Sequence, residues 1–262
     1  MDIHQAIKKR ILVLDGAMGT MLQREQLSEE DYRGGLFREH PVSLKGMNDL
    51  LNLTQPAVVQ QIHRQYLEAG ADVITTNSFN ANFFSLNKYQ LGGMAYQISR
   101  RSAELARHTI EDFQKHDSVS PRYVAGTVGP TDQMASLSPQ VEDPGYRSVE
   151  FDALVEGYLE QIRGLAEGGV DLILVETVFD TLNARAALYA ARQVFRETGR
   201  SLPLMVSGTI AGDSGRSLSG QTVEAFYNAL QPFDLFAIGL NCSFGPVKLL
   251  PFLERLSEKS VL

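Results

Sequence analysis

The sequence predicts an α/β protein in which parallel β-strands alternate with α-helices. Short runs of aliphatic and β-branched residues alternate with longer segments of helical periodicity, which is typical of strand–helix crossover units. A weak internal repeat indicates the same units. EAGADVITTN at 68–77 and EGGVDLILVE at 167–176 share their order of acidic, small and apolar residues, so that Asn77 corresponds to Glu176.

Six short strands are predicted from the aliphatic runs. They cover residues 11–14, 73–76, 123–126, 172–175, 204–207 and 236–240. Helices are predicted at 92–116, 150–168, 181–198, 222–231 and 246–258. The clearest helix begins at Thr54 as N-cap, with Pro56 near its first position, and ends at Gly70. Lys8, Lys9 and Arg10 are expected on the solvated face of an N-terminal helix.

These units favour a closed (β/α)8 TIM-type barrel over an open nucleotide-binding sheet. The first turn, DGAMGT at 15–20, lacks the G-x-G-x-x-G order, and the chain has no G-x-x-x-x-G-K-[ST] loop. A closed barrel of this type has eight strands, so the sequence accounts for about six of eight βα units. We therefore expect residues 1–262 to form one barrel domain that is incomplete at its C-terminus and has exposed strand edges.

Composition limits the partners and the compartment. The 262 residues carry a formal charge of −7 with scattered basic residues, which argues against nucleic acid or an anionic membrane as a partner. A single cysteine excludes an internal disulfide framework. The N-terminus has no apolar core of a secretory signal, and no apolar run approaches the roughly 20 residues of a membrane span. The cytoplasm is the expected location.

Polar residues follow the predicted strands, at the end where parallel α/β folds place their sites. The residues singled out there are Asp15, Asn77, Glu176, Ser207, Asn241 and Cys242. The carboxylates of Asp15 and Glu176 each follow an apolar strand, and together they could bind a cation or act as general acid and base.

Each candidate also has a structural interpretation. Asp15 could cap a turn, Glu176 could pair with Arg185, and an isolated cysteine such as Cys242 is often a small core residue. The glycine-rich segment 207–222 is compatible with a phosphate cradle, a mobile lid or a plain loop whose Ser219 and Thr222 cap the next helix. His63 lacks a second ligand at helical spacing and is not expected to bind metal.

Several ordered motifs resemble a known family. They are ILVLDGAMGTMLQ, LKGMNDLLNLTQP, EAGADVITTNSFNAN, VAGTVGPT, DLILVETVFDTLNARAAL, SGTIAGDSGRSLSGQT and GLNCSFGP. Together they resemble the homocysteine-binding module of cobalamin-dependent methionine synthases, within the homocysteine S-methyltransferase family, from about residue 10 to residue 246. LKGMNDLLNL and ETVFDTLNA favour the methionine synthases over the betaine and S-methylmethionine users.

The resemblance implies a (β/α)8 barrel that holds Zn²⁺ through three cysteines and presents the homocysteine thiolate to methylcobalamin carried by another module. Zn²⁺ removes the thiol proton and keeps the sulfur reactive. Cys242 matches the first zinc cysteine, and Asp15 and Glu176 match the carboxylates that hold the substrate ammonium. Asn241 stands beside the metal ligand, and Asn77 and Ser207 are expected to line the pocket. Folate-binding and cobalamin-binding modules are the implied partners.

The sequence departs from this family pattern in one respect. The family's adjacent cysteine pair, in a Gly-Gly-Cys-Cys segment, is not present, so Cys242 is the single zinc cysteine. The first hypothesis is therefore the N-terminal part of a methionine synthase homocysteine module, functional once the barrel is completed. The alternative is a truncated, inactive barrel fragment that binds a small amino acid or a protein. A lyase or aldolase is disfavoured because no lysine follows a strand.

Overall fold

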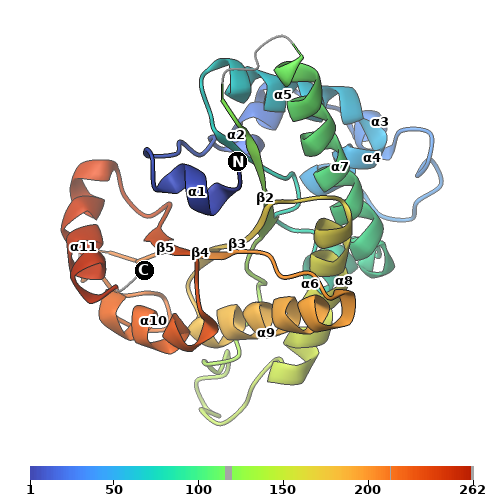
Figure 1. Cartoon of the computed structure of the whole chain (residues 1–262). Coiled ribbons are helices and arrows are strands. Elements are labelled where there is room, and N and C mark those ends of the chain that lie inside the picture. Colours follow the sequence, from blue (N-terminus) through green and yellow to red (C-terminus); the bar gives the residue numbers. More distant parts are fainter. Residues whose placement is uncertain (116–119, 213, 261–262) are drawn as a thin grey trace. The chain divides into compact units, whose positions relative to one another are not determined.

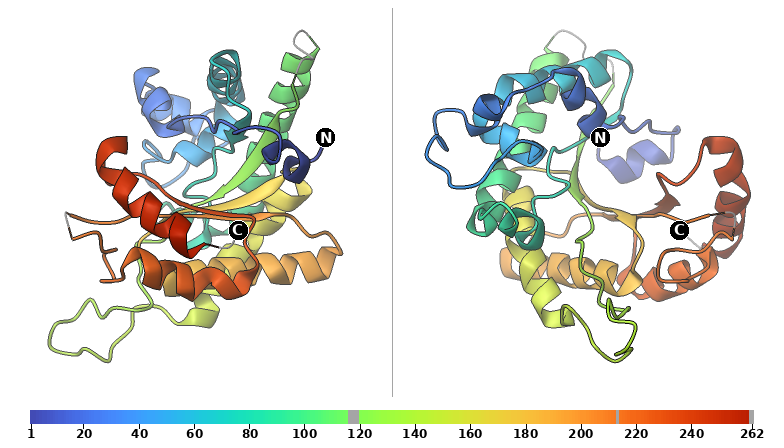
Figure 2. Two further views of the ribbon diagram at one scale, coloured as in Figure 1. Left: turned by 60° about the vertical axis from the view of Figure 1, so that its left-hand side comes forward. Right: turned by 180° about the vertical axis from the view of Figure 1, so that it is seen from behind.

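The computed structural model describes residues 1–115, 120–212 and 214–260 (Figures 1 and 2). The chain divides into two compact units, Met1–Thr127 with Glu160–Leu172, and Val128–Leu159 with Ile173–Leu262. In the described residues of both units the α-helices alternate with parallel strands, as the sequence predicts. One barrel domain over residues 1–262 stays a prediction.

Five strands form in the described residues, and their pairing within each unit is parallel. They are β1 (Val73–Thr75), β2 (Tyr123–Val128), β3 (Leu172–Val178), β4 (Leu204–Gly208) and β5 (Ala237–Leu240). β1 pairs with β2, with Ile74 opposite Val124. β4 lies between β3 and β5 in the second unit (Figure 1). The β2 and β3 side chains are almost all buried, as expected for parallel strands covered by helices on both faces.

The helices agree with the predicted segments to within a few residues. The longer ones are α5 (Pro56–Glu68), α7 (Ala95–Gln114), α8 (Phe151–Glu167), α9 (Thr181–Thr198), α10 (Val223–Leu230) and α11 (Pro246–Lys259). The shorter ones are α1 (Ile3–Ile7), α2 (Met18–Arg24), α3 (Glu29–Arg33), η1 (Asn48–Leu50), α4 (Leu51–Thr54), α6 (Phe83–Asn87), η2 (Gly92–Met94) and η3 (Gln231–Phe233). Among the described residues, no helix is both long and apolar enough to cross a membrane.

The predicted first strand at 11–14 is wrong. This segment makes only an isolated parallel bridge, between Leu14 and Val73, and the Val13 carbonyl accepts the N–H groups of Asp72 and Val73. Ile11 is 87% exposed, and Val13 and Leu14 are exposed as well. A parallel strand is normally buried on both faces, and these side chains bury too little surface to stabilise a longer ladder.

The predicted N-cap of α5 is also wrong. Thr54 closes the preceding helix α4, and Gln55 occupies the N-cap of α5 without a side-chain cap. The proline at position 56 explains the shift, since proline pushes the residue before it out of the helical region. Gln55 has φ −135° and ψ 53°. The predicted helix stop is confirmed by the positive φ of Gly70.

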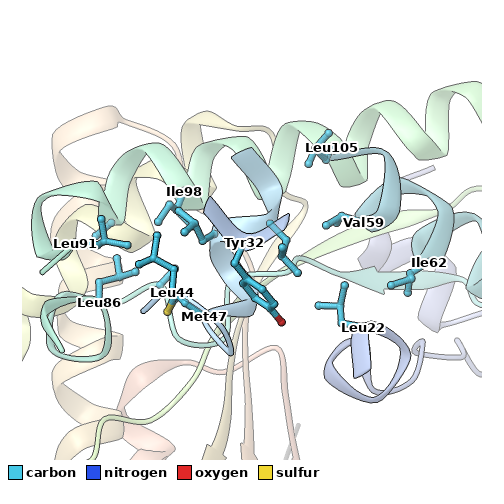
Figure 3. Packing of buried hydrophobic residues seen from close by; sticks show 14 residues of the cluster. Leu22, Tyr32, Leu44, Met47, Val59, Ile62, Leu86, Leu91, Ile98 and Leu105 are labelled. Carbon is cyan, nitrogen blue, oxygen red and sulfur yellow. The ribbon is translucent and has the colours of Figure 1, made fainter. Parts of the chain in front are cut away.

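The first unit has a core built from its helices (Figure 3). Leu22, Val59, Ile62, Leu86, Ile98 and Leu105 are among its buried side chains. Tyr32 lies within this cluster and its hydroxyl donates a hydrogen bond to Asn48 Oδ1 at 2.7 Å. The core therefore fixes the segment 48–52, whose polar side chains contact the end of β1.

Candidate functional site

The carboxyl ends of β3, β4 and β5 lie side by side in the second unit. Backbone hydrogen bonds continue just past the strands, from Thr209 N–H to the Val178 carbonyl and from Asn241 N–H to the Gly208 carbonyl. The β3–β4 register is irregular between Val175 and Val178. A bulge of this kind redirects side chains, and it contains the predicted site residue Glu176.

Asn241 joins the three strand ends through its carboxamide. Its Oδ1 accepts the Thr177 backbone N–H at 3.2 Å and the Ser207 hydroxyl at 2.8 Å. Its Nδ2 donates to Thr177 Oγ1 at 2.8 Å and to Cys242 Sγ at 3.2 Å. The structure thus brings together Asn241, Ser207 and Cys242 from the predicted site residues, and it adds Thr177, which is not one of them.

Cys242 is a free, exposed thiol and not a core residue. It has φ 58°, and its neighbour Ser243 has φ 41°. Non-glycine residues rarely adopt positive φ, and such strain often clusters at functional sites. The Ser243 hydroxyl secures the turn, because it accepts the Ile210 N–H at 2.9 Å and lies 2.7 Å from Thr209 Oγ1.

Glu176 lies half-buried in β3, on the wall of a small cavity of about 10 Å³. Tyr158 and Asp180 also line this cavity, which has room for about one water molecule. The Tyr158 hydroxyl donates to the Gly129 carbonyl at 3.3 Å. Burial, and then the charge of Asp180, raise the pKa of Tyr158, so this hydroxyl stays a neutral donor.

The described residues of the glycine-rich segment that follow β4 are held by hydrogen bonds within the segment and to Phe179. Arg216 donates to the Gly220 carbonyl, and Ser219 donates to the carbonyl of Phe179. Thr222 caps α10, because its hydroxyl accepts the Ala225 N–H at 3.3 Å, whereas Ser219 does not cap a helix. Asp213 lies outside the described residues.

In the first unit, Asp15 and Asn77 lie at the end of β1. The Asp15 carboxylate accepts the Thr75 backbone N–H at 2.8 Å and the Thr75 hydroxyl at 3.0 Å. Asn77 is buried, and its Nδ2 donates to the Asn48 carbonyl at 2.8 Å. The Asn77 carbonyl accepts from Asn52 Nδ2 at 2.6 Å. Asn77 is therefore part of the wall beneath this strand end.

Asp49 is a buried acid that the sequence analysis did not single out. It is 2% exposed, and its Oδ1 accepts the Asn80 N–H at 2.8 Å. Burial raises the pKa of this carboxyl to about 7, against an ordinary value of 3.8. A signal in the sequence is that Asp49 stands directly before the apolar pair Leu50 and Leu51 in LKGMNDLLNL.

The family follows from a match along nearly the whole chain. Residues 12–262 match the family described as homocysteine S-methyltransferase. The chain belongs to the homocysteine S-methyltransferase family.

Solved structures of a homocysteine methyltransferase, MmuM from Escherichia coli, have a similar fold. The metallated form is 22% identical with a TM-score of 0.76, and the match covers 99% of this chain and 84% of that one. The apo form is 21% identical with a TM-score of 0.69, covering 98% of this chain and 81% of that one. At these identities the likeness establishes the α/β fold alone.

The donor set around Cys242 does not by itself fit the metal that this family suggests. Zinc sites use three or four Cys, His, Asp or Glu ligands. In the part of the chain that the structure describes, no group of three such residues could hold a metal ion. His63 lies fully buried.

Proposed function

We propose that this member of the homocysteine S-methyltransferase family is the homocysteine-binding module of a cobalamin-dependent methionine synthase, built on a (β/α)8 barrel. The reaction would transfer a methyl group from methylcobalamin, and ultimately from 5-methyltetrahydrofolate, to the sulfur of homocysteine. The family match over residues 12–262 supports the substrate, and the motifs LKGMNDLLNL and ETVFDTLNA support the methionine synthase type.

One observation carries this proposal. The exposed Cys242 thiol is held by Asn241 at the joined ends of three parallel strands, which is where parallel α/β enzymes place their reacting groups. A structural cysteine is usually buried in an apolar core, whereas Cys242 is exposed and contacts a polar side chain.

The substrate ammonium is assigned to the carboxylates of Asp15 and Glu176. Charge-assisted hydrogen bonds between an ammonium and carboxylates are about twice as strong as neutral ones. Asp15 is already oriented by Thr75. Asn77 is assigned to the wall of the site in the first unit, and Ser207 and Asn241 to the wall in the second. The side chain of each is held by hydrogen bonds to the protein.

We assign Cys242 as one zinc ligand. The chemistry that Zn²⁺ supplies in such sites is removal of the thiol proton at neutral pH. The described residues do not supply a set of three ligands, so the remaining donors would have to come from other groups. The folate-binding and cobalamin-binding modules are the proposed partners.

The first test is calorimetric titration of the protein with homocysteine, with and without Zn²⁺. Glu176→Gln is expected to weaken binding by about tenfold or more, because one charge-assisted hydrogen bond is lost. Glu39→Gln is the matched control, since Glu39 is exposed. Equal affinity of Glu176→Gln and the unchanged protein would remove Glu176 from the site.

Two further measurements separate the proposed type from its alternatives. Methyl transfer from methylcobalamin but not from S-methylmethionine would support the methionine synthase type, and the reverse preference would overturn it. The amount of zinc bound per chain, with Cys242→Ala as the control, tests whether Cys242 is a zinc ligand. If the protein binds homocysteine but neither binds zinc nor transfers a methyl group, the alternative of an amino-acid-binding chain is favoured. The described residues contain no group of three metal ligands, which agrees with that alternative.

A further inference from the structure

We propose that Asn241 is a positioning residue, which orients Cys242 and does not itself contact homocysteine. This inference rests on the proposed function for the role of Cys242, and it changes the role that the sequence suggests for Asn241. It also assigns Thr177 as a second positioning residue.

The Asn241 carboxamide has no capacity left for a substrate. A carboxamide oxygen accepts about two hydrogen bonds and the NH₂ group donates two. The oxygen is occupied by the Thr177 N–H and the Ser207 hydroxyl. The NH₂ group is occupied by Thr177 Oγ1 and Cys242 Sγ. A ligand could bind this group only by replacing one of the four contacts.

The same four contacts fix the direction of the carboxamide. A backbone N–H can only donate, so the Thr177 N–H requires the oxygen of Asn241 on that side. The NH₂ group must then face Thr177 Oγ1 and the sulfur. Cys242 Sγ is also 4.0 Å from Thr177 Oγ1, so two side chains from different strand ends flank the thiol.

The backbone at these strand ends is strained, and the contacts of Asn241 stabilise it. Thr177 and Cys242 both have φ 58°. A non-glycine residue in this region costs on the order of 1–3 kcal/mol and persists where its surroundings determine it. The Asn241 carboxamide makes hydrogen bonds with both strained residues, Thr177 and Cys242. It therefore sets the direction in which the thiol points.

The test uses the fact that Cys242 is the one cysteine in the sequence. Alkylation by iodoacetamide, followed by intact mass, reports this thiol alone. The rate is measured up to its plateau at high pH, where ionisation no longer limits it. The plateau then reports access to the sulfur and its orientation.

Asn241→Ala is expected to raise the plateau rate about threefold to tenfold, the population change that corresponds to losing one hydrogen bond. Thr177→Val is expected to raise it as well, and the double variant no further, because both changes break the same link. Thr177→Ser keeps the hydroxyl, so its alkylation rate should equal that of the unchanged protein. Ser207→Ala leaves both Nδ2 contacts in place and should change the rate less than Asn241→Ala.

Thr222→Ala is the matched control for stability. It removes the cap of α10 in the same unit without touching this cluster. If Thr222→Ala accelerated alkylation as much as Asn241→Ala at equal loss of stability, Asn241 would be merely structural. An unchanged rate in Asn241→Ala would overturn the proposal. These experiments contain no homocysteine, so their failure is distinguishable from a failure of the proposed function.

Discussion

Asp15 is bound through both of its carboxylate oxygens to Thr75, one to the backbone N–H and one to the hydroxyl. Thr75 is the last residue of β1, so this pair holds the acid at the end of a strand although its own segment is not a strand. The carboxylate is thus fixed in place before any substrate binds, which lowers the entropic cost of binding an ammonium.

Asp15→Asn is expected to weaken homocysteine binding by about tenfold or more, because the charge is lost while the shape is kept. The unfolding free energy should fall by less than about 1 kcal/mol, since an amide can still bond to Thr75. Calorimetric titration and urea denaturation measure the two quantities. Thr75→Ser retains both contacts and should match the unchanged protein. Unaltered affinity in Asp15→Asn would assign Asp15 to structure alone.

Asp72 anchors the N-terminal segment that replaces the predicted first strand. It is 3% exposed and accepts two hydrogen bonds from Arg10 at 2.6 Å, one from Arg122 and one from the Val13 N–H. The hydrogen bond from Arg10 is the largest cause that lowers the pKa of Asp72. Asp72→Ala is expected to destabilise the protein by about 3–5 kcal/mol, because the Arg122 side chain, which is only 11% exposed, would lose this partner.

Urea denaturation at pH 7 measures that loss. Arg10→Ala is the control, and it should cost less because Arg10 is 44% exposed. Because the pKa of Asp72 is lowered on folding, its contribution is present at neutral pH and declines as the pH falls through that lowered pKa. Equal stability of Asp72→Ala and the unchanged protein would contradict the anchoring role.

The burial of His63 is expected to reduce the stability of the folded protein in mild acid. Both of its ring nitrogens lack a hydrogen-bond partner among the described residues, and burial lowers its pKa to about 4 from an ordinary 6.5. Between these values the unfolded chain binds a proton that the folded protein excludes. The contribution of His63 to stability should therefore fall by about 3 kcal/mol as the pH drops from 7 to 4, and the contribution of Asp49 rises over the same range. His63→Leu should remove this part of the pH dependence, and His4→Leu, at an exposed position, should keep it.

The burial of Asp49 is expected to have the opposite effect on how stability depends on pH. Its pKa is raised to about 7 on folding, so the folded protein holds a proton that the unfolded chain releases above pH 3.8. The contribution of Asp49 is complete below pH 3.8 and is lost as the pH rises to 7. Asp49→Asn keeps an acceptor for Asn80 and should exceed the unchanged protein in stability at pH 8, by at most about 4 kcal/mol. Thermal unfolding at pH 5 and pH 8 decides this, and an advantage at pH 5 that equals the one at pH 8 would contradict it.

The sequence predicted the second unit better than the first. Short aliphatic runs predict β3, β4 and β5, and helical periodicity predicts the helices between them. Each of these elements is confirmed to within a few residues. The segment 11–14 has the same composition but is exposed, so composition without burial was misleading there. Thr54 failed as a cap because the proline after Gln55 moved the helix start.

The sequence by itself determined the family, the alternation of strands and helices, and the position of Ser207, Asn241 and Cys242 near the ends of β4 and β5, because all three are local patterns of residue type. Only the tertiary structure decided how these residues are used. The bulge at Glu176 and Thr177, the full occupancy of the Asn241 carboxamide and the burial of Asp49 depend on contacts between residues up to 64 positions apart. Such contacts arise from packing and from the satisfaction of buried polar groups, which periodicity in the sequence does not record.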